Sequence, residues 1–264
     1  MGKTKGKPDI FTRFATFVPI TAPPFPTSGM QPTPYIDIHT HRRSNDPYVI
    51  DAYAVGSDGS LPAGPYSAGI HPWEVQRITP DNTSRYRQDL LDALTPRCIA
   101  VGEIGLDYYW DKENHDLQKE WFIRQLDLAR KKEKPVIIHS REAAADTMEI
   151  MKEYASGLRG VIHCYSYSAE MAKEYVKMGY YIGIGGVVTF KNAKKLKQVV
   201  QEIPLESIVL ETDCPYLAPV PYRGKRNSSL YLPYVAEEIA ALKGAAAEDV
   251  VLQTEENARK LYGL

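Results

Sequence analysis

The stretch Ala100-Val101-Gly102-Glu103-Ile104-Gly105-Leu106-Asp107 is a short apolar strand that carries a carboxylate between two glycines. A buried carboxylate without a partner loses several kcal/mol of hydration, so Glu103 needs a cation or a metal ion close by. The other candidate ligands stand where further apolar runs end: His39, His41, His139, His163 and Asp213. The pattern predicts a metal site built at the ends of several strands, with Glu103 in its middle.

The overall composition is that of a globular protein. The chain has 264 residues, of which 44% are hydrophobic and 25% charged, and its formal net charge is −1. This charge argues against a protein that coats nucleic acid, which needs an excess of basic residues. It leaves open a protein that grips only the end of a strand, because bound divalent ions supply positive charge themselves.

Cysteine usage and hydropathy restrict the compartment. Cys98, Cys164 and Cys214 are an odd number without regular spacing, which argues against a disulfide framework and favours a reducing compartment. No apolar run approaches the roughly 18 residues of a membrane span. We therefore expect a cytoplasmic protein without a membrane segment, and we expect a monomer.

Residues 1–34 differ from the rest of the chain. They contain seven prolines and show no sustained hydrophobic period. We interpret them as a disordered or loosely attached leader, and residues 35–264 as a single domain. Met30 precedes the first strong strand, so translation could also start there.

Apolar strands alternate with amphipathic helices along residues 35–264. The expected strands are 35–41, 66–73, 99–106, 135–141, 160–164, 180–186 and 207–213. The expected helices are 81–94, 117–129, 143–154, 168–179, 192–202, 232–243 and 248–262. This alternation predicts an α/β fold, a (β/α)₈ TIM-like barrel. A further strand at 48–55 lies too close to His41 for a helical crossover, so the second βα unit should be abbreviated.

The candidate ligands all lie at the ends of strands where such barrels place their catalytic groups. His39 and His41 alone could be incidental residues of a polar edge strand, and Glu103 could simply cap a loop. However, five of the six histidines end apolar runs, which favours metal binding. Four imidazoles and two carboxylates are too many for one tetrahedral ion but suit two ions.

Three other residue types receive structural interpretations. Cys164 and Cys214 should face the core, because neighbours on a strand alternate between its faces. His115 opens a helix and should lie on the surface. His71 ends a short strand, and could be either a substrate contact or a packed surface group.

Seven motifs in order resemble the TatD family of metal-dependent deoxyribonucleases. They are Asp37-Ile-His39-Thr-His41, Gly69-Ile-His71-Pro72, Gly102-Glu103-Ile-Gly105-Leu-Asp107-Tyr108-Tyr109, Ile138-His139-Ser140-Arg141, His163-Cys164-Tyr165-Ser166, Glu211-Thr212-Asp213-Cys-Pro215-Tyr-Leu217 and Arg223-Gly-Lys-Arg226-Asn227. The resemblance covers the chain from about residue 35 to its end. It implies a barrel of the amidohydrolase type that hydrolyses phosphodiester bonds of DNA, often from the 3′ end of single strands.

The resemblance also implies roles for individual residues. His39, His41 and Asp213 would hold one divalent ion together with Glu103, which would bridge to a second ion. His139 and His163 would hold that second ion, and both ions could be Zn²⁺, Mn²⁺ or Mg²⁺. Glu103 and Asp213 would be the catalytic residues, with Asp213 orienting or deprotonating the attacking water.

Substrate contacts are implied for four residues nearer the rim: His71, Tyr109, Arg223 and Asn227. Three features depart from the family pattern: the leader, the short segment between His41 and His71, and the residues at Arg42 and Ser228-Ser229. These departures affect the expected range of substrates more than metal binding.

Two other functions remain open at this point. The chain could be an amidohydrolase acting on a cyclic amide, a lactone or an ester. That class usually bridges its metals with a carbamylated lysine on the fourth strand, whereas here Glu103 takes the bridging position. Alternatively, the chain could be a metal-binding scaffold without catalysis, which the complete ligand set argues against.

The interpretation of the leader can be tested by removing it. A chain that begins at Met30 should keep the melting temperature and metal content of the full chain, because the leader lacks the apolar periodicity of a core element. Calorimetry and elemental analysis of both proteins make the comparison. A large loss of stability would show that the leader packs on the barrel.

Overall fold

The structure is a computed structural model that describes residues 35–264, so the predicted leader lies outside the described residues. Eight strands form one sheet in the order β1 to β8, and every neighbouring pair is parallel. The strands are β1 (Asp37–Thr40), β2 (Val49–Ala54), β3 (Tyr66–Gly69), β4 (Cys98–Asp107), β5 (Val136–Arg141), β6 (Gly160–Ile162), β7 (Tyr180–Ile184) and β8 (Ile208–Leu210). The predicted (β/α)₈ architecture is therefore confirmed.

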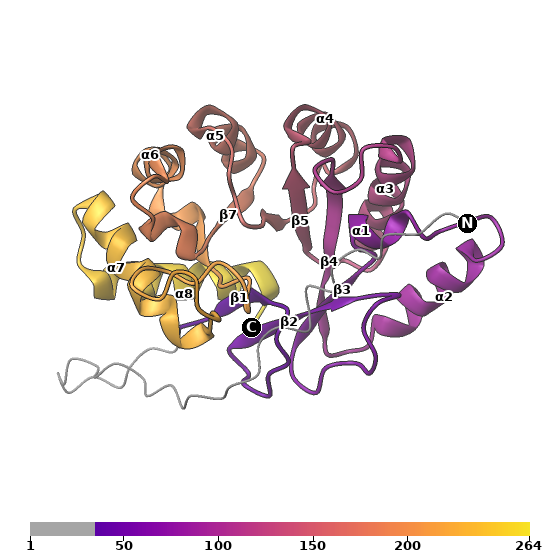
Figure 1. Cartoon of the computed structure of the whole chain (residues 1–264), viewed down its shortest axis with the longest axis horizontal. Coiled ribbons are helices and arrows are strands. Elements are labelled where there is room, and N and C mark those ends of the chain that lie inside the picture. The colour runs from indigo at the N-terminus through magenta and orange to yellow at the C-terminus, as the bar shows by residue number, and fades with distance from the viewer. Residues whose placement is uncertain (1–34) are drawn as a thin grey trace, which may run out of the picture. The chain divides into compact units, whose positions relative to one another are not determined.

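Helices follow the strands from β3 onward and surround the sheet (Figure 1). They are α1 (Pro72–Val75), α2 (Thr83–Ala93), α3 (His115–Lys131), α4 (Ala144–Tyr154), α5 (Ala169–Lys177), α6 (Lys194–Glu202), α7 (Leu232–Lys243) and α8 (Ala247–Tyr262). Three single 3₁₀ turns are η1 (Gly186–Thr189), η2 (Leu205–Ser207) and η3 (Ser229–Tyr231). None of the described helices is long and apolar enough to cross a membrane.

The uncertain strand at 48–55 exists as β2, which pairs in parallel with both β1 and β3. The abbreviation that the sequence predicts extends further than one unit. Neither residues 41–48, between β1 and β2, nor residues 55–65, between β2 and β3, contain a helix. The first quarter of the barrel is therefore joined by loops, which is why no amphipathic period was visible there.

Alternation along the strands decides which side chains face the centre of the barrel. In β5, Val136 and Ile138 belong to the large cluster that packs most of the helices against the sheet, whereas Ile137 belongs to a second cluster with Val161 of β6 and Val209 of β8. Side chains two positions further along a strand point the same way. The chain therefore delivers His139, His163 and Glu211 to the interior, above this second cluster.

The barrel closes between β8 and β1 through the segment that follows β8. The sequence predicts a strand up to Asp213, but β8 ends at Leu210, and Asp213 adopts a left-handed conformation with φ of 56°. The Asp213 N–H still donates to the His39 carbonyl at 3.1 Å, and the His41 N–H donates to the Cys214 carbonyl at 2.8 Å. The same backbone hydrogen bonds thus close the barrel and place Asp213 beside His39 and His41.

The buried Asp37 carboxylate supports this closure from below. It accepts hydrogen bonds from the Thr212 N–H at 2.9 Å and the Thr212 hydroxyl at 2.6 Å. The Ser229 hydroxyl donates to it at 2.6 Å. One of the two serines that depart from the family pattern therefore has a structural role at the seam between β1 and β8.

Helix α8 holds both sides of the same seam. The Asn257 side chain donates to the carbonyls of Leu205 and of Ile208, which begins β8, at 2.9 and 2.7 Å. The Tyr262 hydroxyl donates to the carbonyl of Ile38 in β1 at 2.9 Å. The helix therefore satisfies backbone groups on the two strands that share no ladder.

Replacing Asn257 with alanine should destabilise the barrel, because the buried carbonyl of Ile208 and the partly buried carbonyl of Leu205 lose their donor. The cost of such unsatisfied groups is about 1–3 kcal/mol, and each kcal/mol lowers Tm by roughly 2–4 °C in a domain of this size. Thermal unfolding followed by circular dichroism measures the change. The control is Glu256→Ala, which removes exposed contacts with Lys260 and Gln253 on the same helix. Equal melting temperatures of the two variants would show that Asn257 does not secure the seam.

Candidate metal centre

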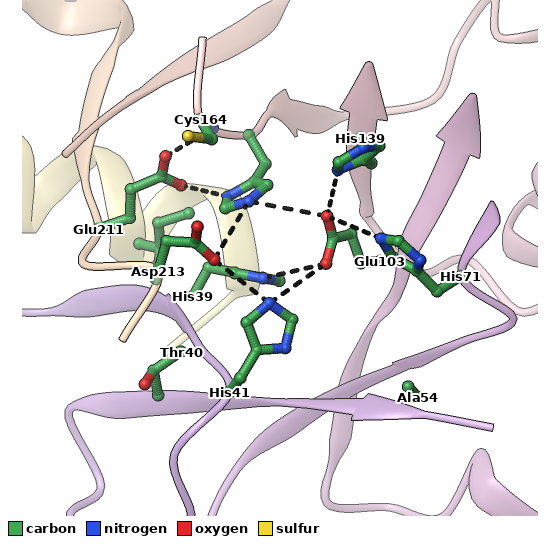
Figure 2. Close-up of polar contacts among 12 residues, drawn as sticks. His39, Thr40, His41, Ala54, His71, Glu103, His139, Cys164, Glu211 and Asp213 are labelled. Carbon is green, nitrogen blue, oxygen red and sulfur yellow. Dashed lines mark hydrogen bonds and ion pairs between the residues drawn. The ribbon is translucent and has the colours of Figure 1, made fainter. Parts of the chain in front are cut away.

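The structure brings all six predicted ligands together at the carboxyl ends of the strands (Figure 2). Three overlapping groups contain them, each with potential ligand atoms within 4.8 Å of one another: His39 with His41 and Asp213, His39 with Glu103 and His163, and His71 with Glu103 and His139. Such convergence of imidazoles and carboxylates is the arrangement that transition-metal sites use.

Glu103 lies at the centre and presents its two oxygens to different partners. Oε2 is 3.4 Å from Nε2 of His39 and 3.6 Å from Nε2 of His41. Oε1 is 2.6 Å from Nδ1 of His139 and 3.7 Å from Nε2 of His163. The carboxylate therefore stands between two sets of donors, which is the position of a bridging ligand.

Glycines allow β4 and β5 to approach closely around Glu103. Gly105 has φ of +139°, and a Cβ atom there would lie 2.0 Å from the carbonyl oxygen of His139. A Cβ on Gly102 would lie 2.6 Å from Cβ of Ile137. Any larger residue would push β5 away and separate His139 from Glu103.

Two carboxylates that sequence reasoning missed orient the histidines of the second set. Asp107 Oδ2 lies 3.1 Å from Nε2 of His139, so Nδ1 of that ring faces Glu103. Glu211 Oε2 lies 2.8 Å from Nδ1 of His163, so Nε2 of that ring faces Glu103 and Asp213. Carboxylates behind metal-binding histidines fix the ring and increase its basicity.

A signal for both carboxylates was present in the sequence. Asp107 ends the same strand as Glu103, and Glu211 precedes Asp213 by two residues. The position of Glu211 also depends on Gly183 in the neighbouring strand β7, because a Cβ atom on this glycine would lie 2.6 Å from Glu211 Oε2. Such contacts between strands could not be read from one strand alone.

The pKa values of Glu103 and His39 favour the protonation states that bind cations. Burial alone would raise the pKa of Glu103, but His71, His139 and His163 hold it well below its usual value, so the carboxylate is ionised. Burial, together with His163, lowers the pKa of His39 to about 4. At neutral pH the imidazole of His39 is therefore in the neutral form that binds metals.

The histidines of the second set behave in the opposite way. Burial opposes the charge on His139 and His163, but the adjacent carboxylates prevail. Glu103 and Asp107 raise the pKa of His139 to about 9, and Glu211 and Glu103 raise the pKa of His163 to about 10. Without an ion these rings hold protons, so binding of a metal here releases protons and weakens as pH falls.

His71 lies in the ring of histidines around Glu103, with Nε2 3.5 Å from Oε1. Its Nδ1 accepts a hydrogen bond from the Trp73 N–H at 3.0 Å, which fixes the orientation of the ring. Nε2 of His71 is therefore the ring nitrogen that faces Glu103, beside that of His139.

The other predicted substrate contacts lie in different surroundings. Tyr109 is 42% exposed at the rim, and the Arg223 guanidinium stacks over the Phe190 ring at 4.3 Å. The structure does not bring Asn227 to the substrate side, because its buried side chain donates to the Thr212 carbonyl at 2.8 Å. Asn227 therefore supports the loop that carries Asp213.

Two of the structural interpretations need correction. Cys164 does not face the core: at φ of 45° it leaves the strand alternation, and its sulfur lies within 4.8 Å of ligand atoms of His163 and Asp213. His115 is not an ordinary surface residue, since its half-buried ring stacks on Tyr108 at 3.6 Å. The interpretation of Cys214 is confirmed, because this side chain is buried.

A (β/α)₈ barrel with this cluster at the carboxyl ends of its strands defines the class of metal-dependent hydrolases. Comparison with known proteins identifies the family. The model described as "TatD related DNase" matches residues 62–263, so the chain belongs to the TatD family. Its similarity to named relatives and to solved structures is consistent with this assignment.

Three relatives illustrate the similarity. The chain is 50% identical over 195 residues to "Uncharacterized metal-dependent hydrolase YabD" of Bacillus subtilis, covering 74% of this chain and 75% of that protein. It is 30% identical over 244 residues to "3'-5' ssDNA/RNA exonuclease TatD" of Citrobacter rodentium, covering 84% and 93%. The crystal structure of YJJV, a TatD homolog from Escherichia coli, superposes with a TM-score of 0.71 at 26% identity, covering 82% and 86%.

Replacing Glu103 with glutamine should lower the metal content of the protein. The amide keeps the shape but removes the charge that both donor sets face, and the only other carboxylate near the inner nitrogens of His139 and His163 among the described residues is Asp213, 3.8 Å from Nε2 of His163. Activity should fall by several orders of magnitude, while circular dichroism should show an intact fold. Elemental analysis after dialysis measures the metal, with the exposed Glu113→Gln as control. Full metal content with near-normal turnover would contradict a bridging role.

Proposed function

We propose that this protein hydrolyses phosphodiester bonds of DNA with two divalent metal ions, and that it releases nucleotides from the 3′ end of single strands. One observation carries the proposal: the two oxygens of Glu103 face two separate sets of histidines. The exonuclease name of the Citrobacter relative supports the choice of substrate.

The donor atoms fit a pair of divalent ions. Among residues 35–264, both ring nitrogens of His39 and Oε2 of Glu103 are buried and find no hydrogen-bond partner. Buried polar atoms almost always have partners, so the unpartnered Nε2 of His39 and Oε2 of Glu103, which lie 3.4 Å apart, indicate a place for a cation. His39, His41 and Asp213 would hold one ion, and His139 and His163 the other. This ligand set suits Zn²⁺ or Mn²⁺ better than Mg²⁺.

When bound, the two ions supply positive charge that stabilises the attacking and the leaving oxygen of the displacement. The protein supplies the base. Burial would raise the pKa of Asp213, but its bond to His41 and the nearby His163 hold it below its usual value. The carboxylate is therefore ionised, and at 17% exposure it can accept a proton from a water molecule.

Two further groups can orient the phosphate. Nε2 of His71 can donate a hydrogen bond beside Glu103. The Arg223 guanidinium rests on Phe190 with its planar edge available, and this edge matches two oxygens of a phosphate. Both groups favour a phosphoryl substrate over a neutral amide or lactone.

The amidohydrolase alternative lacks its usual bridging residue. Strand β4 has the sequence CIAVGEIGLD and strand β5 the sequence VIIHSR, so neither contains a lysine that could be carbamylated. The bridging position in β4 is occupied by Glu103. This observation favours the nuclease.

The proposal predicts metal-dependent shortening of a single-stranded oligonucleotide labelled at its 5′ end. The ladder should recede from the 3′ end, stop after chelation, and resume when Mn²⁺ or Zn²⁺ is restored. Gel electrophoresis follows the products, beside a panel of dihydroorotate, lactones and simple esters. Glu103→Gln serves as the inactive control.

The other outcomes discriminate among the alternatives. Hydrolysis of a cyclic amide, lactone or ester without release of nucleotides would establish the amidohydrolase. Full metal content without turnover of any substrate would indicate a scaffold. Either result would overturn the proposed function.

A further inference from the structure

We propose that Tyr109 and Trp110 form a stacking platform for an unpaired nucleobase beside the scissile phosphate. The inference rests on the proposed function and adds to it the recognition of the substrate. It explains why the end of a strand must be single-stranded: bases inside a duplex have no free face to offer.

The two rings are exposed next to the metal centre. Tyr109 is 42% and Trp110 51% exposed, although large aromatic side chains usually bury most of their surface. Their rings meet edge to face at 4.9 Å, and Trp110 also contacts the ring of Trp73 edge to face at 6.2 Å. The rings are therefore held in a defined arrangement with surface left to stack on.

One carboxylate ties this platform to the metal centre. Oδ1 of Asp107 accepts hydrogen bonds from the backbone N–H groups of Tyr109 and Trp110, both at 3.1 Å. Oδ2 of the same carboxylate lies 3.1 Å from Nε2 of His139. The backbone that carries both rings is thus fixed relative to His139, a ligand of the proposed second ion.

A guanidinium accompanies the aromatic surface. Arg141, two residues after His139, places its guanidinium 3.9 Å from the centre of the Tyr109 ring and 5.7 Å from that of Trp110. Within residues 35–264 no carboxylate forms an ion pair with it. Its donors therefore remain available for a phosphate, while the ring below holds it in place.

This combination selects the class of ligand. Aromatic faces with adjacent guanidinium groups are typical of sites for single-stranded nucleic acid, because every base has a face for stacking and every nucleotide a phosphate. A platform of this kind binds bases with little regard to sequence. We therefore expect a requirement for an unpaired base at the strand end, and little preference among the four bases.

The test compares two oligonucleotides that differ only in the 3′-terminal residue, which carries a base in one and is abasic in the other. Their last linkages are methylenephosphonates, so that the metal-loaded protein binds without cleaving. Fluorescence anisotropy measures Kd for the wild type, Trp110→Ala and Trp110→Phe. The control is Tyr48→Ala, another exposed aromatic, whose backbone pairs with Asp37 at the opposite end of β1.

Removal of one stacked base contact should weaken binding about 5- to 150-fold. Trp110→Ala should therefore raise Kd for the base-bearing strand by this factor and leave Kd for the abasic strand unchanged. Trp110→Phe should restore most of the affinity, and Tyr48→Ala should resemble the wild type. Equal effects of Trp110→Ala on both strands, or no effect on either, would overturn the platform.

The result is separable from the proposed function. If the wild type distinguishes the two strands through Trp110 but releases no nucleotide from a cleavable strand, then the platform stands and DNA hydrolysis fails. If cleavable strands are shortened but both ends bind alike, the hydrolysis stands and the platform fails.

Discussion

The candidate metal centre depends on one buried carboxylate, that of Glu103. Glu103 sits among histidines from several strands, and its charge is compatible with burial only because these imidazoles surround it. Each of its oxygens faces a different donor set. A shift in the register of these strands would therefore separate Glu103 from its partners. Gly105 makes the observed register possible, because without a side chain it lets β4 lie against the backbone of His139.

Two further carboxylates, those of Asp107 and Glu211, orient the histidines of this cluster. Glu211 fixes the ring of His163 and also accepts a bond from the Cys164 N–H at 2.6 Å. Asp107 fixes the ring of His139 and holds the loop that presents Tyr109 and Trp110. Asp107 thus connects the candidate metal centre to the exposed loop after β4. A change in the conformation of this loop should therefore shift the ring of His139.

At the seam of the barrel, too, a single segment serves both the fold and the site. The segment after β8 closes the sheet against β1 and carries Asp213 to His41 at 3.2 Å. Asn227, Asn257 and Tyr262 hold this region by bonds to backbone carbonyls. Stability and function are coupled here, because the strands that close the barrel also complete the set of ligands.

The sequence by itself determined the barrel and the six residues predicted as ligands, since both follow from local patterns: apolar runs, their spacing, and an imidazole or carboxylate where each run ends. It did not determine the roles of Asp107, Glu211 and Asn227, nor the departure of Cys164 from strand alternation. Those depend on which backbone lies opposite each side chain. Contacts between strands distant in sequence arise only when the barrel closes, and so only the tertiary structure decided them.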